Sequence, residues 1–478
     1  MNKFFQLVLI AIFPVLIFGE QNLTLEKCRQ LALKNNRQIK MANENIAASH
    51  HNVKSSFTAF LPKLNLVGNY TRLNNKIKYQ TPELSIPVGN RDGSFAPEHL
   101  KIVKGDDGLP LTKPDGTPIM VPKNWIHMGS QTLNLGEHNN YILNIGLIQP
   151  LFTGGKILQQ YKISKSTEKI AKAKKVLTRS EVILKTDELF WKILSIKEKV
   201  KLAQDYQKLV KTHIRDLEEY LREGLITEND LLKAKVKLNE AKMNLLKAQN
   251  GLALAKMALC QHMGLPLSEK ITLQNREKTD YITLNSPERE DDFLNKRSEL
   301  QILKESVKIN ESLEKIAISQ YLPNILLTSN YTTLNPNPYN SFKEEFGSDF
   351  NVGISCEIQL FNWNQRWHKV SAARHLKNSA QQKYEESKDL IKLEVRQAAF
   401  RVNESIKKIN LATVTMLQAE ENLKVTEDNF KEGIAKSSDV LEAQTLWQKA
   451  KSEVIDSKSE YKINQAIYNK TIGKYNLQ

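Results

Sequence analysis

The chain has 478 residues, of which only 19 are Gly and 15 are Pro, so we expect most of it to be uninterrupted secondary structure. It carries 69 basic and 53 acidic residues, a formal net charge of +16. The basic residues are mixed with Glu along amphipathic segments, so we interpret them mainly as solvated helix surface, with polyanion binding as the alternative. Cys28, Cys260 and Cys356 lack metal-ligand spacing, and we interpret them as small apolar residues in preference to a disulfide.

Residues 1–19 have the organisation of a secretory signal peptide. A short positive start at Lys3 is followed by an apolar run over residues 4–17, and Gly19 marks the expected cleavage region. No later stretch approaches the roughly 20 apolar residues of a transmembrane helix. If the protein enters a membrane, it must therefore do so by β-strands.

The chain repeats itself. Short motifs recur at an offset of 261 residues near the start of each half and at 209 residues further on, so the first half carries an insertion of 52 residues. We therefore predict a signal peptide at residues 1–19, a first repeat at 20–264, a linker at 265–292 and a second repeat at 293–478. The matching pairs include residues 60–62 (FLP) with 321–323 (YLP), 69–71 (NYT) with 330–332 (NYT), 151–152 with 360–361 (both LF), and 223–224 with 432–433 (both EG).

The insertion is rich in turn residues. Pro, Gly and Asp concentrate in residues 86–89 (IPVG), 105–110 (GDDGLP) and 113–118 (KPDGTP). Such a density predicts a long loop over residues 76–138 with room for its own hairpin. We expect this loop at the cell surface.

Four segments alternate apolar and polar residues as β-strands do. They cover residues 64–71, 141–151, 325–331 and 349–360, and the last is the clearest, with Phe350, Val352 and Ile354 on one face. This pattern is typical of a lipid-embedded barrel with a wet interior, although a soluble sheet with one buried face is the alternative. Because four strands cannot close a barrel, the membrane interpretation requires several chains to pool their strands.

The remaining sequence predicts long helices. Residues 156–222 contain neither Pro nor Gly, and one helix of that length would extend on the order of 100 Å. The next segment predicts a coiled-coil seam, which a dimeric rod would satisfy equally well. The seam consists of Leu231, Leu238, Leu245, Leu252 and Leu259, with Ala234, Ala241, Ala248 and Ala255 between them, and it recurs more loosely over residues 440–468.

Several short motifs, in their order and duplication, resemble the outer-membrane efflux family of TolC-like channels over nearly the whole mature chain. They are residues 23–36 (LTLEKCRQLALKNN), 297–300 (RSEL), the strand-to-helix junctions 149–155 (QPLFTGG) and 359–362 (QLFN), and the turns 223–230 (EGLITEND) and 432–443 (EGIAKSSDVLEA). The resemblance implies an α+β, mostly α fold, in which long helical hairpins form a periplasmic α-barrel and each chain of a homotrimer gives four strands to a twelve-stranded barrel in outer-membrane lipid.

The function implied by the resemblance is a passive exit duct of a tripartite multidrug or metal efflux system, or of type I secretion. An inner-membrane pump of the RND or ABC type would drive transport through a periplasmic adaptor, or membrane fusion, protein. No cofactor, metal or nucleic acid is implied, and the protein is not expected to be an enzyme. The expected location is the outer membrane, extending into the periplasm.

Two sites follow from the resemblance. The helical turns are expected to meet the adaptor through Gly224, Leu225, Thr227, Gly433 and Ile434. Asp439 and Glu442, with Asp230 in the first half, are expected to form the channel gate. Three residues apart on a helix, Asp439 and Glu442 share a face, so a trimer would stack two rings of carboxylates. The alternative is a local role, in which the two glycines end the preceding helices and the carboxylates cap the helices that follow.

The sequence departs from better-known members at the gate. Positions that there carry a Tyr and an Arg tying the tips shut are Phe430 and Ala435 here, opposite Asn229 and Asp230. Phe has no hydroxyl and Ala no donor, so we expect the closed state to be held less tightly or by other pairs.

Three other classes of protein compete with this interpretation. An extracytoplasmic structural coiled coil without transport explains the seam but not four matched strands. A nucleic-acid binder has only the +16 charge in its favour. An enzyme is least supported, because the chain has no GxSxG, HExxH or P-loop motif, and the adjacent His50 and His51 point in different directions on a helix.

Overall fold

The computed structural model describes residues 21–90, 93–135, 137–274, 281, 283–284 and 290–476. They fall into a helical unit, which comprises the described residues up to 57 with 155–319 and those from 362, and a strand unit of residues 58–154 and 320–361. Each unit takes segments from both predicted repeats, and the repeat boundaries remain predictions. The predicted signal peptide lies outside the described residues.

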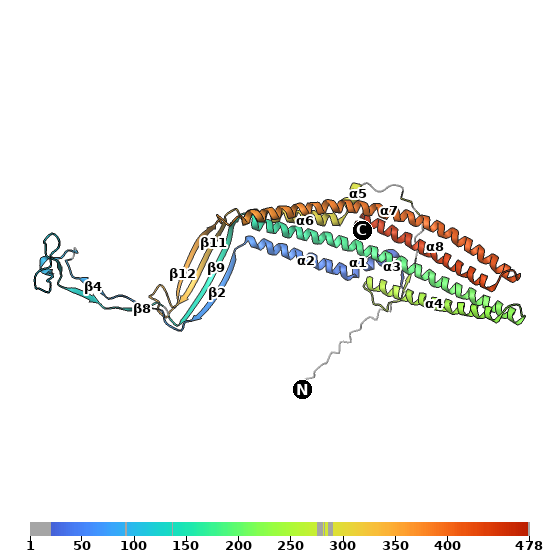
Figure 1. Cartoon of the computed structure of the whole chain (residues 1–478), viewed down its shortest axis with the longest axis horizontal. Coiled ribbons are helices and arrows are strands. Elements are labelled where there is room, and N and C mark those ends of the chain that lie inside the picture. Colours follow the sequence, from blue (N-terminus) through green and yellow to red (C-terminus); the bar gives the residue numbers. More distant parts are fainter. Residues whose placement is uncertain are drawn as a thin grey trace, which may run out of the picture. The chain divides into compact units, whose positions relative to one another are not determined.

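Two hairpins of equal length dominate the helical unit. Helix α3 (Lys156–Arg222) pairs with α4 (Glu228–His262), and α7 (Gln365–Lys431) pairs with α8 (Ser437–Thr471). The long helices have 67 residues each and the shorter ones 35. Figure 1 shows the α3–α4 hairpin in green and the α7–α8 hairpin in orange and red. The helix predicted over residues 156–222 is confirmed.

Shorter elements complete the helical unit. They are β1 (Gln21–Leu23), α1 (Leu25–Asn35), α2 (Arg37–Phe57), β10 (Ile271–Leu273), α5 (Glu290–Leu294) and α6 (Ser298–Ser319). Helix α3 packs against α2, α4, α6 and α8, while α7 packs against α6 and α8. Strands β1 and β10 pair in parallel, so the predicted linker contributes a strand that was not expected. Among the described helices, none combines the length and the apolar composition that a membrane span needs.

The two long helices start differently. Gly154 and Gly155 precede α3 with φ angles of +59° and +83°. At the corresponding positions before α7, Trp363 and Asn364 adopt φ angles of +51° and +62°. Only glycine takes this left-handed conformation without steric cost, so the second junction is the strained one.

The predicted coiled-coil seam is buried unequally in the two hairpins. On α4 its ends are buried at Leu231, Ala234 and Leu259, but its middle is only half-buried at Leu245 and Leu252. On α8 the seam is mostly buried, because α8 packs against both α3 and α7. The buried seam residues of α8 are Val440, Ala443, Ala450, Val454, Ser457, Tyr461 and Tyr468.

The cysteines are free thiols, in agreement with their interpretation as small apolar residues. Cys28 and Cys260 are fully buried in one hydrophobic cluster with Phe190 and Leu259, and Cys356 is exposed. Burial raises the pKa of the Cys28 thiol to about 12, which keeps it protonated at physiological pH.

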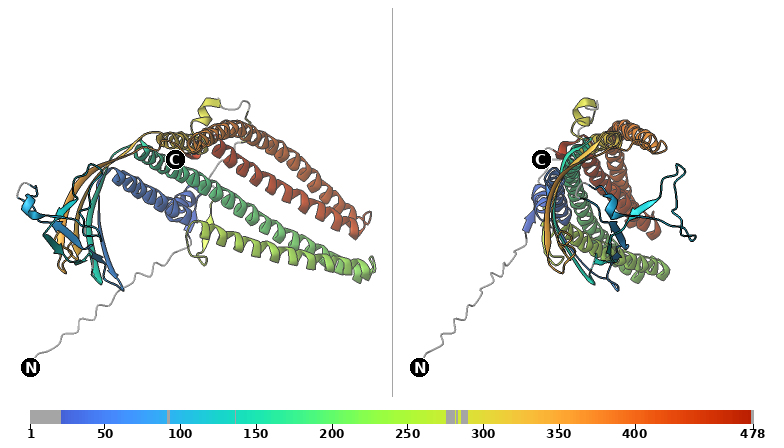
Figure 2. Two further views of the ribbon diagram at one scale, coloured as in Figure 1. Left: turned by 60° about the vertical axis from the view of Figure 1, so that its left-hand side comes forward. Right: turned by 90° about the vertical axis from the view of Figure 1, so that its left-hand side faces the viewer.

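The strand unit is built on a four-stranded antiparallel sheet. Its strands are β2 (Lys63–Arg72), β9 (Asn139–Thr153), β11 (Asn324–Asn335) and β12 (Gly347–Glu357), in the order β12-β11-β9-β2. Both views of Figure 2 show these strands side by side in one curved sheet. The fourth predicted strand was too long, because β11 begins at Asn324 and offers no partner beyond Glu357.

The register confirms the predicted faces. Leu66 pairs with Ile145, Ile145 with Tyr331, and Tyr331 with Phe350, so one apolar row crosses all four strands. The residues that alternate with this row are mostly polar and bond to one another across strands. Asn330 donates to Asn351 at 3.2 Å, and Thr332 donates to Asn144 at 3.3 Å.

The insertion forms a two-stranded ribbon, in agreement with the hairpin expected there. It consists of three antiparallel pairs within residues 76–138 and continues from the β2–β9 end of the sheet (Figure 1). The pairs are β3 (Lys78–Gln80) with β8 (Thr132–Asn134), β4 (Leu84–Pro87) with β7 (Trp125–Met128), and β5 (Leu100–Ile102) with β6 (Met120–Pro122).

Candidate functional site

Helix α3 ends in a Schellman motif, which forms the turn toward α4. Gly224 has φ +74°, its N–H donates to Leu221 O at 3.1 Å, and Leu225 N–H donates to Tyr220 O at 2.9 Å. Glycine is required here because side chains rarely adopt this conformation. Leu225, directly after it, is 67% exposed.

The turn after α7 has the same construction. Gly433 has φ +75° and its N–H donates to Phe430 O at 3.1 Å, while Ile434 N–H donates to Asn429 O at 2.8 Å. Ile434 is 76% exposed. The local role expected for both glycines is confirmed, and each turn presents one large apolar side chain to its surroundings.

Thr227 and Asp230 form the predicted capping box at the start of α4. Thr227 Oγ1 accepts from Asp230 N–H at 3.3 Å and donates to Asp230 Oδ2 at 2.7 Å. This hydroxyl lowers the pKa of the Asp230 carboxyl, and Lys436 in the other turn lowers it further. The Asp230 charge therefore lies within electrostatic reach of the second turn.

Asp439 and Glu442 lie exposed in the first two turns of α8. Asp439 caps the helix, because its Oδ2 accepts from Lys436 N–H at 3.0 Å and its Oδ1 from Ser438 Oγ at 3.1 Å. Glu442 is on the same side, three residues further. Within the described part of the chain, no hydrogen bond or ion pair joins Asp230 to either carboxylate.

The hairpins are joined near the tip by Phe430 and by residues that the sequence did not single out, His213, Tyr220 and Ser437. Phe430 packs against His213 with ring centroids 5.1 Å apart and against Tyr220 at 5.6 Å. His213 Nε2 lies 3.0 Å from Ser437 Oγ at the first residue of α8. Phe430 thus serves as a packing residue between the two hairpins of one chain. The expectation that the closed state is held less tightly or by other pairs remains a prediction.

Two further contacts link α3 to α8 above the tip. The hydroxyls of Tyr206 and Thr445 lie 3.2 Å apart, and Lys199 forms an ion pair with Asp456 at 2.7 Å. Tyr206 is buried, while both members of the ion pair are partly exposed. The contacts from Lys199 to Phe430 hold the two hairpins together in the part of each hairpin that leads to its turn.

An ion pair on a buried carboxylate joins α1 to α3 in the part of the helical unit away from the turns. Arg29 of α1 donates two hydrogen bonds of 2.7 Å to Asp187 of α3, whose side chain is 1% exposed. Tyr475, beyond α8, donates to the same carboxylate at 2.6 Å. Three segments distant in sequence are thus joined at one carboxylate, with every strong contact charge-assisted.

Metal-ligating residues do not gather in the part of the chain that the structure describes, where no three His, Cys, Asp or Glu side chains lie close enough to hold an ion. His50 instead lies 3.4 Å from Glu168. The three carboxylates predicted at the tip, Asp230, Asp439 and Glu442, lie in the first two turns of α4 and α8 of the same chain.

Known proteins share both sequence and fold with this chain. Residues 120–265 and 292–473 match the family described as outer membrane efflux protein. The chain is 22% identical over 301 residues to the outer membrane protein TolC of Escherichia coli, and this match covers 60% of each protein. The chain thus spans about 60% of the length of this relative.

Solved structures at lower identity show the same fold. The outer membrane protein VceC of Vibrio cholerae matches with a TM-score of 0.68 at 15% identity, over 94% of this chain and 96% of VceC. The CmeC outer membrane channel of Campylobacter jejuni matches with a TM-score of 0.70 at 18% identity, over 94% of this chain and 85% of CmeC. The fold is TolC-like, α+β and mostly α. Because the family match covers well over half of the chain, this protein belongs to the outer membrane efflux protein family and resides in the outer membrane, extending into the periplasm.

Proposed function

We propose that three copies of this chain form the exit duct of a tripartite efflux or type I secretion system. The duct is a passive conduit, and an inner-membrane pump of the RND or ABC type supplies the driving force through a periplasmic adaptor. The family is described as outer membrane efflux protein and CmeC as an outer membrane channel, which supports transport without catalysis. Drugs, metals or a secreted protein are the classes of cargo that such a duct would carry.

The open edges of the sheet carry this proposal. Among the described strands, β2 and β12 each pair with one neighbour only, and the apolar row of Leu66, Ile145 and Phe350 is exposed in the single chain. In a bilayer every backbone group must be paired, so the β2 edge must meet the β12 edge of another copy. Three copies supply twelve strands, with the polar row facing the lumen.

Exposed apolar stripes on the helices support the same assembly. One runs along α4 and another along α7, each at spacings near multiples of 3.5 residues, which is typical of helix pairing. Neither stripe is covered by the residues that the structure describes. The stripes consist of Leu232, Val236, Met243, Leu246, Leu254 and Met257 on α4, and of Leu390, Leu393, Phe400, Leu411 and Val414 on α7.

The tip residues have proposed roles in this assembly. Gly224, Leu225, Thr227, Gly433 and Ile434 form the adaptor-binding turns, in which the exposed Leu225 and Ile434 supply the apolar contacts. Asp439 and Glu442 line the gate as two rings of three carboxylates, and Asp230 of the first half belongs to the same gate. Such rings favour cations over anions in a narrow lumen.

Purification from the outer membrane followed by planar-bilayer recording tests this function. The expected result is a heat-modifiable trimer that conducts ions, together with increased drug susceptibility or lost secretion in a deletion strain. A soluble periplasmic dimer without conductance would instead establish a structural coiled coil.

A further inference from the structure

The start of α7 presents two indole rings to its surroundings. Trp363, directly before the cap residue Asn364, is 86% exposed, and Trp367, one turn later, is 61% exposed. Trp363 also has a φ of +51°, a conformation that bulky side chains rarely adopt. Exposing rings of this size to water is unfavourable. An environment less polar than bulk water would therefore stabilise this segment.

The same segment carries basic residues and no acidic ones. Residues 365–384, the first part of α7, contain neither Asp nor Glu. Lys369 is exposed and forms no ion pair with a described residue, whereas Arg374 and Lys377 pair with Glu314 of α6 at 3.1 and 2.8 Å. The basic residues of the segment are Arg366, Lys369, Arg374, Lys377 and Lys383.

These cations lie where the helix dipole disfavours them. The N-terminal end of a helix carries partial positive charge, which stabilises acidic residues and destabilises basic ones in the first turn. Neither α3 nor α7 has an acidic residue in its first turn, whereas α4 has Glu228 and Asp230 there and α8 has Asp439. The helices that follow the turns obey the dipole, and those that follow the strands do not. An external anion would offset both the dipole and the basic side chains.

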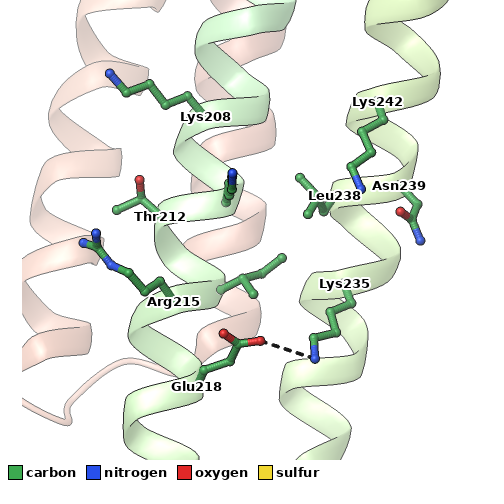
Figure 3. A pocket seen from close by; sticks show the side chains of 10 residues that line it. Lys208, Thr212, Arg215, Glu218, Lys235, Leu238, Asn239 and Lys242 are labelled. Atoms are coloured by element: carbon green, nitrogen blue, oxygen red, sulfur yellow. Dashed lines mark ion pairs between the residues drawn. The ribbon is translucent and has the colours of Figure 1, made fainter.

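Basic residues near the turns have different neighbours. A cavity of about 740 Å³ between α3 and α4 has Lys211 and Lys242 in its lining, and none of its lining residues is aromatic. In Figure 3, Glu218 of α3 and Lys235 of α4 extend toward each other at this cavity, and they form an ion pair of 3.4 Å. This surface has mixed charge and suits water. The start of α7 differs because it combines exposed indoles with unmixed positive charge.

That combination fits the boundary between a lipid bilayer and water. Tryptophan is enriched at this boundary, and basic residues beside it attract anionic headgroups. The headgroup layer is roughly 5–8 Å thick, and the helix advances about 6 Å between Gln365 and Lys369. One headgroup layer can therefore contain Trp363, Arg366, Trp367 and Lys369 together.

We infer that the start of α7 binds anionic phospholipid headgroups in the periplasmic leaflet of the outer membrane. Trp363 and Trp367 lie at the edge of the hydrocarbon, and Arg366 and Lys369 bind the phosphate groups. Only residues 358–364 separate the helix from β12, which keeps the site close to the last strand along the chain. The inference rests on the outer-membrane location of the protein and not on transport.

Quenching of tryptophan fluorescence by brominated lipids tests the inference on the full-length protein. The protein is reconstituted in phosphatidylcholine vesicles with about 20% phosphatidylglycerol, and one lipid class is brominated at a time. The chain has five Trp, so the difference between wild type and W363F/W367F isolates the two indoles. We expect phosphatidylglycerol to quench them severalfold more than its share of the lipid predicts. This excess should shrink between about 50 and 500 mM NaCl.

Charge variants identify the residues that bind the headgroups. R366Q/K369Q keeps both indoles and should lower the preference for phosphatidylglycerol severalfold, and K369E alone should lower it too. K407Q/K424Q removes two charges from exposed positions further along α7 and should keep the wild-type preference. Equal losses in R366Q/K369Q and K407Q/K424Q, or wild-type quenching in proportion to the bulk lipid composition, would overturn the inference.

Two further outcomes would assign the segment to another ligand. If neither lipid quenches Trp363 and Trp367, another copy or another protein covers them, and the inference is wrong. If excess inorganic phosphate at constant ionic strength abolishes the preference, the segment binds free phosphate and not lipid. Conductance is a separate measurement, which R366Q/K369Q should retain. A protein that prefers anionic lipid but forms no pore would contradict the proposed channel and leave this inference intact.

Discussion

His213 Nε2 lies 3.0 Å from Ser437 Oγ, and each of these residues is 5% exposed. The contact joins the C-terminal part of one hairpin's long helix to the first residue of the other hairpin's short helix. Phe430 closes the arrangement from the end of α7. One imidazole therefore contacts both helices of the second hairpin, close to the turns that we propose bind the adaptor.

Replacing His213 by Ala should loosen the second hairpin. The change removes a hydrogen bond, leaves Ser437 unsatisfied and opens a cavity beside Phe430, a combined cost of about 2–4 kcal/mol. Amide hydrogen exchange should accelerate at the start of α8 and the end of α7. Ser437→Ala, which removes only the hydroxyl, should cost about 1 kcal/mol. An unchanged exchange pattern in both variants would show that the contact does not stabilise the second hairpin.

The same contact should weaken in acid. Burial lowers the pKa of His213 from 6.5 to about 4, although Asp216 acts in the opposite direction. Between these values the unfolded chain binds more protons, so the stabilisation falls as pH drops from about 6.5 to 4, by roughly 3 kcal/mol in total, and then levels off. Hydrogen exchange at α8 measured across this range should show the decline.

His213→Gln is the control for that measurement, because Gln can bond to Ser437 without titrating. Burial raises the pKa of the neighbouring Glu427 carboxyl, so acidification relieves its cost and acts against the histidine effect. The difference between wild type and H213Q isolates the histidine, and identical pH profiles would contradict the prediction.

Neutralising the two gate carboxylates should reduce cation selectivity. Asp439→Asn with Glu442→Gln removes both proposed rings while Asn continues to cap α8. The reversal potential in a KCl gradient should shift toward zero, with weaker block by divalent cations. Glu228→Gln removes a first-turn carboxylate from α4 instead and should leave the potential unchanged; equal shifts would place selectivity elsewhere.

Adjacent residues of β12 should respond in opposite ways to a charge. Val352→Lys places an ammonium on the apolar face, at a cost of about 2–4 kcal/mol per chain near the bilayer midplane. Asn351→Lys places it on the polar face, where water solvates it. The yield of heat-modifiable trimer should fall for V352K alone, and loss of trimer in N351K alone would invert the two faces.

The Asp187 carboxylate should be critical for the stability of the helical unit. Asp187→Asn removes the two charge-assisted hydrogen bonds to Arg29, which is partly exposed and keeps Glu26 at 3.6 Å, so we expect a cost of about 2–4 kcal/mol. Tyr475→Phe removes one hydrogen bond to a charged carboxylate and should cost about 1.5–3 kcal/mol. Lys185→Ala breaks the exposed pair with Glu188 one turn away and should cost less than 1 kcal/mol, as denaturant titration can show.

Periodicity predicted the parts of this fold that depend on local geometry. The faces of Phe350 and Val352 follow from two-residue alternation, and the length of α3 follows from the absence of Pro and Gly between residues 156 and 222. The capping box of Thr227 and Asp230 was predictable because its members are three residues apart. In each case the signal lies within a few consecutive residues.

Tertiary contacts could not be predicted from the sequence, because the residues that form them are far apart along the chain. His213 and Ser437 are 224 residues apart, and neither has an unusual local pattern. Lys211 and Lys242 were interpreted only as part of the general surface charge, because the pairing of α3 with α4 is what places both of them on one cavity. Strands β1 and β10 have three residues each, too few for alternation to be recognised.

The equal lengths of the two hairpins restrict how this protein can change. One residue inserted into α3 would rotate every later side chain by about 100° and turn His213 away from Ser437. Seven inserted residues would nearly restore the face but lower one tip by about 10 Å relative to the other. The length of the helical unit can therefore change only in steps of seven residues. The contact between the hairpins is kept only if all four helices gain the same number of heptads.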